Sequence, residues 1–379
     1  MPDVTPDSAE TRRLLERVTT GTHDLADAPM VTDVAAFLSD DVFRQEVDRF
    51  FLGSPQVVGF AGQVRAPGSF LATEVVGRPL VVTRDADGVL RAFVNACAHR
   101  GARVVEDSGT GARLTCRFHG WTYSLDGQLA GRRQNDAFPA ADRCGLTPLA
   151  VSDRSGLLVV APTPEVGQDA VDGHLAGIEA QFAGFGFDHM VELEERRFDV
   201  EANWKLIAAV SGESYHFATL HRDTVARWLH DNAVFDDFGR HGRWAFALHG
   251  IERLADVPQE EWPAHPPGAI SHVLFPGTVV ITNGDSAQMI RTEPGTGPDA
   301  TPSRSHVRYL GVCRDTADRD AELASYRFGG TAFETEDLPV VIETQRGLSA
   351  RGGSIVVGRN EPMVQLMHRV WRDGVDDER

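Results

Sequence analysis

The spacing of hydrophobic positions divides the chain into three stretches. In residues 1–50 apolar side chains recur at helical spacing, most clearly from Phe37 to Phe51, and they predict a helical segment. From 51 to 163, short apolar runs are separated by Gly, Pro and Asp, and Asp85–Gly88 has the composition of a hairpin turn. This second stretch therefore predicts a small antiparallel β domain.

The third stretch, 164–379, begins within a Pro- and Gly-containing linker at 162–168 and contains both helical and strand patterns. Helices and strands are segregated along it rather than alternating, so the chain predicts an α+β fold and not a doubly wound sheet. We expect the 1–50 segment to pack on this third domain. The predicted helices cover 170–190, 203–231 and 337–350, and the predicted strands cover 241–253, 270–283 and 304–314.

Charge and cysteine content narrow the possible functions. The formal net charge is −18, which opposes non-specific binding to nucleic acid or to an anionic membrane. The N-terminus has no signal-peptide pattern and no apolar run approaches the ~18 residues of a spanning helix, so we expect a cytoplasmic protein. Four cysteines in 379 residues are too few for a disulfide scaffold, which makes metal or redox chemistry the question to ask.

Two Cys/His pairs lie in the β stretch, each beside a glycine. Cys97 and His99 follow one apolar run, and Cys116 and His119 follow another. Two thiolates and two imidazoles suit either a tetrahedral zinc or a [2Fe–2S] cluster. Because a chain of this size does not need a metal to fold, a functional cluster is favoured over a structural zinc. The other two cysteines, Cys144 and Cys313, are expected to be packing residues.

The segments around these pairs, Cys-Ala-His-Arg-Gly and Cys-Arg-Phe-His-Gly-Trp, resemble the Rieske motif. The resemblance implies that Cys97 and Cys116 hold one iron of a [2Fe–2S] cluster and that His99 and His119 hold the other. Four arginines crowd the same loops, on a chain that is otherwise acidic. They predict a docking face for an acidic electron donor, steered by charge; these residues are Arg100, Arg103, Arg113 and Arg117.

A second pair of histidines, His216 and His221, lies in the predicted helix 203–231. On a regular helix residues five apart point about 140° away from each other, so the rings converge only if the helix ends or bulges between them. The surrounding Asn203-Trp204-Lys205 and Glu213-x-Tyr-His resemble the catalytic helix of Rieske-type non-heme iron aromatic ring-hydroxylating oxygenases, in their alpha subunit. This resemblance extends over about residues 45–370.

The resemblance implies a Rieske domain at 51–163 and a helix-grip catalytic domain at 164–379, in which helices cover an antiparallel sheet. It also implies a mononuclear iron(II) held by His216, His221 and a distant carboxylate. Asp337 occupies the matching position, Glu336 competes with it, and Asp223 is a weaker candidate. By the same resemblance Glu213 carries electrons from a Rieske histidine of a neighbouring subunit, which implies a ring-like homo-oligomer, expected to be a trimer.

The implied function is a terminal oxygenase that takes electrons from NAD(P)H through a ferredoxin or flavin reductase. It would use O2 to hydroxylate an aromatic or other small organic substrate; oxidative N- or O-demethylation of a quaternary ammonium or methoxy compound is the alternative. Relatives often carry Glu-Asn where this chain has Ala209 and Val210, and this favours an apolar cyclic substrate. A Rieske electron-transfer protein and a zinc hydrolase using His216 and His221 are the hypotheses from other classes.

Overall fold

The computed structural model describes residues 8–263, 265–297 and 300–376. It divides into two compact units, which are treated separately below. The β unit runs from Val47 to Val191. The catalytic unit combines the segment up to Glu46 with everything from Glu192 onward. No helix in the described part of the chain is long and apolar enough to cross a membrane.

Three small sheets build the β unit, and the first two share an apolar core that includes Leu80, Val82, Leu158 and Val160. The third packs in a separate cluster around Leu114 and Tyr123. The largest sheet has the order β10 (Pro148–Leu149), β5 (Leu90–Val94), β4 (Arg78–Arg84), β3 (Ser69–Val75), β6 (Gly109–Thr110). The second sheet has the order β11 (Val151–Arg154), β12 (Leu157–Val160), β2 (Gln56–Phe60). The third has the order β7 (Arg113–Thr115), β8 (Thr122–Ser124), β9 (Leu129–Gly131).

Residues 164–191 belong to the β unit, whereas the sequence pattern placed the domain boundary after residue 163. Only a short helix, α4 (Gln168–Gly173), and single helical turns form where a long helix over 170–190 was predicted. The apolar side chains of this segment are buried against the β unit: α4 contacts β11 and β12, and the Phe187 ring packs edge-on against Phe60 at 5.1 Å. The segment has no strand pattern of its own that would assign it to the β unit from sequence.

A seven-stranded sheet forms the centre of the catalytic unit. Its strands β14 to β19 pair antiparallel in chain order, and β13 lies at the edge beside β19. The strands are β14 (Leu229–Phe238), β15 (His241–Leu248), β16 (Gly268–Leu274), β17 (Thr278–Thr282), β18 (Ser286–Pro294), β19 (Ser305–Arg314) and β13 (Met190–Val200). The strand predicted over 270–283 is thus two strands, joined at Phe275-Pro276-Gly277, where the proline and glycine favour a turn.

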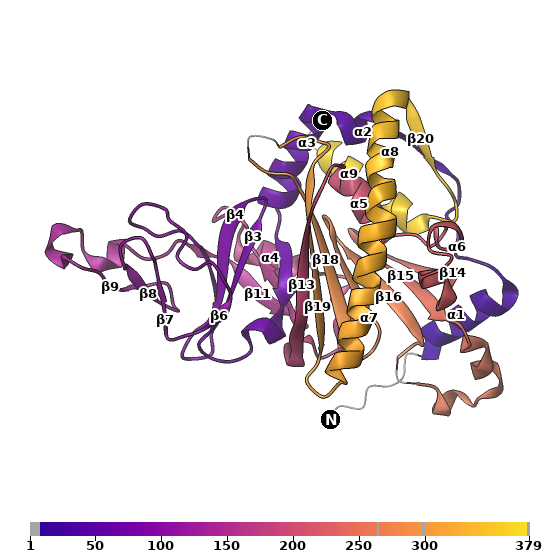
Figure 1. The fold of residues 1–379 in the computed structure, drawn as a ribbon, viewed down its shortest axis with the longest axis horizontal. Coiled ribbons are helices and arrows are strands. Elements are labelled where there is room, and N and C mark those ends of the chain that lie inside the picture. Colours follow the sequence, from indigo (N-terminus) through magenta and orange to yellow (C-terminus); the bar gives the residue numbers. More distant parts are fainter. Residues whose placement is uncertain (1–7, 264, 298–299, 377–379) are drawn as a thin grey trace. The chain divides into compact units, whose positions relative to one another are not determined.

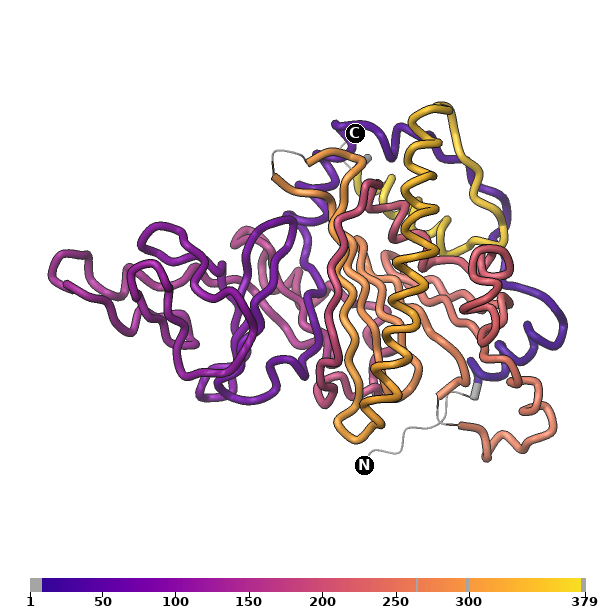
Figure 2. Tube along the Cα trace, in the orientation of Figure 1, coloured from indigo at the N-terminus to yellow at the C-terminus, as the bar shows by residue number. Residues whose placement is uncertain are grey.

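Two consecutive helices cross one face of this sheet as a single rod, as Figures 1 and 2 show. They are α7 (Arg319–Ala332) and α8 (Leu338–Arg351), joined by η10 (Phe333–Asp337), a wider π-type turn that interrupts the regular helix. Such turns mark functional sites in many helices. The helix predicted over 337–350 is therefore present, whereas α7 and the C-terminal α9 (Pro362–Asp376) were not predicted.

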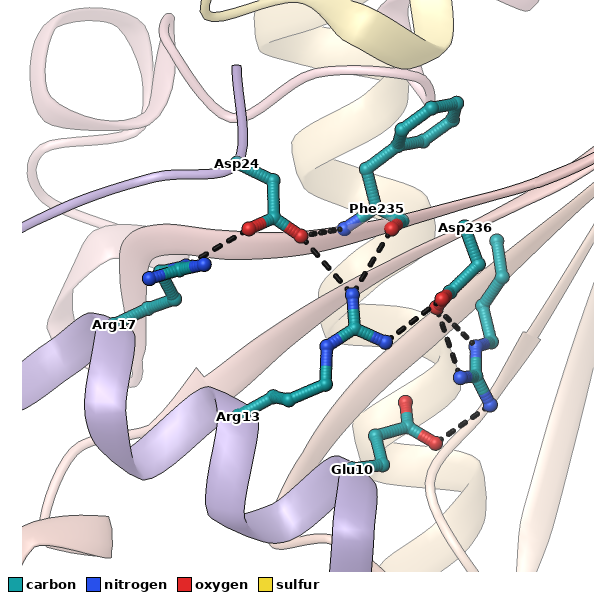
Figure 3. Close-up of polar contacts among 7 residues, drawn as sticks. Glu10, Arg13, Arg17, Asp24, Phe235 and Asp236 are labelled. Atoms are coloured by element: carbon teal, nitrogen blue, oxygen red, sulfur yellow. Dashed lines mark hydrogen bonds and ion pairs between the residues drawn. The ribbon is translucent and has the colours of Figure 1, made fainter.

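The N-terminal helix α1 (Ser8–Thr20) is fixed to strands β14 and β15 by ion pairs and by apolar packing of Leu14. Figure 3 shows Arg13 bonded to both Asp24 and Asp236, with the Asp236 contact at 2.7 Å. Arg243 on β15 completes the chain of charges by binding Glu10 at 2.7 Å and Asp236 at 2.9 Å. The smaller elements of this unit are α2 (Ala35–Leu38), α3 (Asp40–Glu46), and the antiparallel pair β1 (Met30–Asp33) and β20 (Ser354–Val357).

The Asn203-Trp204-Lys205 triplet fixes helix α5 (Trp204–Val210), which leads into the candidate site. The Asn203 side chain caps the helix by accepting from the Lys205 N–H at 3.0 Å. The Trp204 indole N–H donates to a buried Glu46 carboxylate at 2.9 Å, and the Lys205 ammonium pairs with the same carboxylate and with the Ala36 carbonyl. This motif is therefore structural in this chain.

Replacing Lys205 by methionine is expected to lower the free energy of unfolding of the catalytic unit by about 3–5 kcal/mol, because it leaves the Glu46 charge buried without its cationic partner. Both side chains of the pair are almost fully buried. Calorimetric unfolding of Lys205→Met would measure the loss. The double variant Lys205→Met/Glu46→Gln should recover part of it, and a double variant as unstable as the single one would contradict the explanation.

Candidate active site

The predicted helix 203–231 is broken, and the break brings the two histidines together. Helix α5 ends at Val210, and a single turn, α6 (Phe217–Leu220), begins seven residues later; strand β14 already starts at Leu229. His216 immediately precedes α6 and His221 immediately follows it, so their rings lie 4.9 Å apart at an angle of 67°. Gly212 favours the break because glycine is a poor helix former.

Asp337 supplies the third group. It is the last residue of η10, and its Oδ1 atom lies 3.1 Å from His221 Nε2 and 3.7 Å from His216 Nε2. One ligand atom from each of the three residues lies within 4.8 Å of the other two. The Oδ1 atom is buried and has no hydrogen-bond partner within the described residues, although two ring nitrogens are close. Three potential ligand atoms that face one point without hydrogen-bonding to each other fit a metal ion. Two histidines with one carboxylate suit iron(II).

The two competing acids have other roles in the structure. Glu336 binds the opposite ring nitrogen of His221, Nδ1, at 2.5 Å and accepts a hydrogen bond from Thr224 Oγ1 at 2.8 Å. Asp223 is exposed and pairs with Arg222 and Arg227. Asp337 is therefore the acid that faces both histidines.

Glu213 is hydrogen-bonded to Nδ1 of His216, as Glu336 is to Nδ1 of His221. It bonds His216 Nδ1 and accepts the His216 backbone N–H at 3.2 Å. A carboxylate at each Nδ1 fixes both rings and leaves each Nε2 for a metal. Burial alone would lower the pKa of His221, but the adjacent carboxylates of Asp337 and Glu336 raise it overall.

A cavity of about 720 Å³ opens beside this triad, between the sheet and the α7–α8 rod. Its walls are mainly apolar and aromatic, and they include Val210, Phe217, Trp228, Phe246 and Phe333. Other aromatic residues of this unit do not line the cavity: Trp244 and Phe275 are core residues, and Phe235 lies elsewhere. A buried apolar space next to a reactive centre is the usual form of a small-molecule site.

In the β unit, the two Cys/His loops have the same backbone design. The amide of Gly101 donates to the Cys97 carbonyl at 2.8 Å, and the amide of Gly120 donates to the Cys116 carbonyl at 2.9 Å. Both glycines have a φ near +75° that other residues rarely adopt, which explains why glycine follows each pair. Each loop thereby holds its buried cysteine and its histidine at one end of the unit.

The four side chains suit two metal ions better than one. The thiols of Cys97 and Cys116 are hydrogen-bonding neighbours, and the rings of His99 and His119 lie 4.5 Å apart. However, no three of these four ligand atoms lie within 4.8 Å of one another. In the described ranges, the group that meets this distance is that of His216, His221 and Asp337. Sulfur paired with sulfur and nitrogen with nitrogen is the arrangement expected of a cluster with one Cys₂ iron and one His₂ iron, and not of tetrahedral zinc.

The surroundings of this donor set also fit a cluster. Tyr123 donates its hydroxyl to Cys97 Sγ at 3.1 Å and accepts from the Ala98 N–H at 3.0 Å. His99 Nδ1 is buried with no partner within the described residues, and burial, with His119 and Arg100, lowers the pKa of His99 so that the ring stays neutral. Burial raises the pKa of the Cys97 thiol, so a bound metal is what would make it a thiolate.

Comparison with known proteins decides the family. Residues 187–377 match the family described as "Ring hydroxylating alpha subunit (catalytic domain)", and residues 54–146 match the "Rieske [2Fe-2S] domain". The chain belongs to the ring-hydroxylating alpha-subunit family. A chain of this family is a Rieske non-heme iron oxygenase, so the cofactors are a [2Fe–2S] cluster and a mononuclear iron, with O2 as co-substrate and a reductase chain as the source of electrons.

Individual relatives of this oxygenase differ in the compounds that they are named for. It is 26% identical to the carnitine monooxygenase oxygenase subunit of Acinetobacter baumannii, over 83% of this chain and 84% of that protein. It is 33% identical to the glycine betaine monooxygenase oxygenase subunit of Chromohalobacter salexigens, but over 48% of this chain and only 41% of that protein. A crystal structure of a quaternary ammonium Rieske monooxygenase superposes with a TM-score of 0.76 at 21% identity, covering 92% of this chain and 96% of the other.

One residue of this Rieske oxygenase that the motif did not reveal lies next to the candidate cluster ligands. Arg132 sits 4.9 Å above the Trp121 ring, which in turn stacks on His99 at 5.0 Å and nearly parallel. Its N–H groups bond only to neutral groups, among them Cys144 Sγ at 3.3 Å, and it forms no ion pair within the described residues. The positive charge next to the ligand is therefore not neutralised, and Cys144 helps to hold it.

We expect Arg132→Met to shift the reduction potential of the cluster to a more negative value, because the reduced cluster carries the extra negative charge that Arg132 stabilises. A redox titration followed by the electron paramagnetic resonance signal measures this. Arg132→Lys, which keeps the charge, and Arg133→Met, at an exposed neighbour, should leave the potential nearly unchanged. Equal shifts for the lysine and methionine variants would mean that packing, and not charge, is responsible.

Proposed function

We propose that this chain is a terminal oxygenase in which His216, His221 and Asp337 hold the mononuclear iron and a small, mainly apolar, cyclic or aromatic molecule is hydroxylated in the adjacent cavity. The observation that carries the proposal is the convergence of three ligand atoms within 4.8 Å at the wall of a 720 Å³ cavity. The iron supplies O2 activation when bound. The cavity excludes water and positions the substrate, and the two carboxylates at Nδ1 hold the ligand rings.

Oxidative demethylation of a quaternary ammonium compound is the second candidate. Two observations favour it: the named relatives act on carnitine and glycine betaine, and aromatic rings such as Trp228 and Phe246 attract cations. Both compounds also carry a carboxylate, but no lysine or arginine lines the cavity within the described residues. Arg291 on β18 is buried, pairs with Glu293 and does not line the cavity. The cavity therefore favours the first candidate.

A reconstituted assay would separate the two candidates. Purified oxygenase, an electron-transfer reductase and NADH would be incubated with toluene, benzoate, glycine betaine or carnitine, and oxygen-dependent products identified by mass spectrometry. We expect a hydroxylated product from toluene and no formaldehyde from the quaternary compounds. Formaldehyde release with no arene product would instead establish the demethylase.

We further propose that Glu213 links the iron site to a Rieske histidine of a second copy, and that the chain is a homo-oligomer, most simply a trimer. Glu213 supports this because it already bonds one candidate iron-ligand histidine, and each of its carboxylate oxygens, now engaged by one bond to His216, can accept a further hydrogen bond. Two inactive variants provide the test: Cys116→Ser lacks the cluster and Asp337→Ala lacks the iron. After subunit exchange, the mixture should regain activity if electrons cross between copies, and no recovery would contradict this.

The arginine-rich loops are the proposed docking face for a ferredoxin or reductase. The structure reduces the net charge expected of them, because Arg103 pairs with Glu74 and Arg117 with Glu106. Arg100 lies over the exposed Phe118 ring at 5.9 Å, so an apolar contact adds to the charge. We expect the rate of electron delivery to fall as salt rises from 0.05 to about 0.5 M, since screening weakens steering. A salt-independent rate would rule out the charged face.

A further inference from the structure

One wall of the cavity carries a polar pair inside otherwise apolar surroundings. Gln288 on β18 and Tyr309 on β19 both line the cavity, and the Tyr309 hydroxyl donates to Gln288 Oε1. With Oε1 occupied, Gln288 keeps its Nε2 amide group, which has no hydrogen-bond partner within the described residues. A half-buried N–H donor is thus available to whatever occupies the cavity.

The pair is held rigidly. The Tyr309 ring stacks on Tyr326 at 5.1 Å and on Phe333 at 5.8 Å, and burial with the nearby Tyr326 raises the pKa of Tyr309 so that its hydroxyl stays a donor. Helix α7 makes room with two consecutive glycines. A Cβ on Gly329 would lie 3.1 Å from the Tyr309 hydroxyl, and one on Gly330 would lie 2.7 Å from its ring. Glycine destabilises the interior of a helix, so two glycines here indicate that the close approach of the Tyr309 side chain is required.

The charges of the lining point to the class of molecule. Glu213 and Asp337 are the acids of the wall, and the described lining residues include no lysine or arginine. A carboxylate in this space would be buried near two acids with no lysine or arginine to pair with, and the charge of the one cation beside it, the iron, is already opposed by Asp337 and Glu213, so its burial is unfavourable. A carbonyl or ether oxygen would instead accept from Gln288 without any charge.

We propose that Gln288, oriented by Tyr309, selects substrates that carry a neutral hydrogen-bond acceptor, over anions and over plain hydrocarbons of the same shape. This deepens the proposed function and rests on it. An aromatic ketone fits the requirement: its ring meets the aromatic walls and its oxygen meets the Gln288 amide. The selection acts on binding, so it can be measured without turnover.

The test compares three probes of similar shape by calorimetric titration of the iron-loaded enzyme without O2: acetophenone, α-methylstyrene, in which CH₂ replaces the oxygen, and benzoate. We expect acetophenone to bind about fivefold more tightly than α-methylstyrene, the value of one ordinary hydrogen bond. Benzoate should bind most weakly. Equal binding of the first two, or no binding of acetophenone, would overturn the proposal.

Variants locate the effect. Gln288→Glu keeps an acceptor for Tyr309 but removes the amide donor, and should abolish the preference for acetophenone. In a lone Gln288→Leu variant the freed Tyr309 hydroxyl could donate to the ligand in place of the amide. The double variant Gln288→Leu/Tyr309→Phe is therefore the second test, and it should also abolish the preference for acetophenone. Ile281→Val, on the neighbouring strand opposite Gln288, is the matched control and should alter both affinities equally. A preference that survives both Gln288 variants would overturn the assignment.

The proposed hydroxylation and the proposed selectivity of Gln288 can be contradicted independently. If acetophenone binds with the expected preference but no oxygen-dependent product forms from any compound, the selection stands and the proposed function is wrong. If hydroxylation occurs with equal use of ketone and hydrocarbon, the function stands and the selection is wrong.

Discussion

Asp337→Ala is expected to abolish turnover and to reduce the iron content of the purified chain from about three atoms to about two. The remaining two atoms belong to the cluster, whose visible and electron paramagnetic resonance spectra should be unchanged. Among the described residues, Asp337 is the acid that faces both His216 and His221, so alanine leaves two neutral ligand atoms for the ion. Substitutions that only touch a ligand cost 10–100-fold, so loss of a ligand should cost more than about 100-fold in activity.

The controls for this experiment are two other acids near the site. Asp223→Ala, at an exposed position paired only with arginines, should change neither iron content nor turnover. Glu336→Ala should weaken iron binding through loss of orientation of His221 without removing a ligand. A variant with Asp337 replaced that keeps three irons would show that the ligand assignment is wrong. Wild-type protein with two irons would support an electron-transfer Rieske protein, and protein that contains zinc and no cluster would support a hydrolase.

The predictions from sequence succeeded where one pattern repeats or one motif is compact. Short apolar runs separated by Gly, Pro and Asp, with the turn composition of Asp85–Gly88 between β4 and β5, were enough to predict an antiparallel β domain. The pattern failed at β13, whose sequence Glu-Leu-Glu-Glu-Arg-Arg lies at a sheet edge and buries little, so it carries no apolar signal. It also failed at the C-terminal helix α9, although apolar residues there recur at helical spacing and could have been recognised.

The site residues were predictable as a set, but not their division of roles. Asp337 and Glu336 are adjacent in sequence, and which one faces the two histidines depends on the π-type turn that ends at Asp337. No local signal specifies that turn. Gln288 and Tyr309 were not predicted because each is an ordinary strand residue, and their pairing arises from the register of β18 and β19 beneath two helix glycines.

Glu213→Gln is expected to leave all three irons in place but to slow turnover 10–100-fold, because the charge that ties His216 to the electron path is lost. Glutamine retains a side-chain oxygen that can accept from His216, so the ligand ring stays oriented. The step that should slow is the oxidation of the reduced cluster when O2 and substrate are added. Stopped-flow absorbance at the wavelengths of the cluster measures that step directly.

Glu336→Gln provides a control with matched chemistry, because both acids bond the Nδ1 atom of a candidate ligand histidine. If Glu213 only orients its histidine, the two glutamine variants should slow cluster oxidation to a similar extent. If Glu213 also links to the histidine of a second copy, its variant alone should retain a reduced cluster over the time in which the Glu336 variant has reacted. Because the two positions differ in this one proposed contact, the ratio of the two rates measures what that contact contributes to electron transfer.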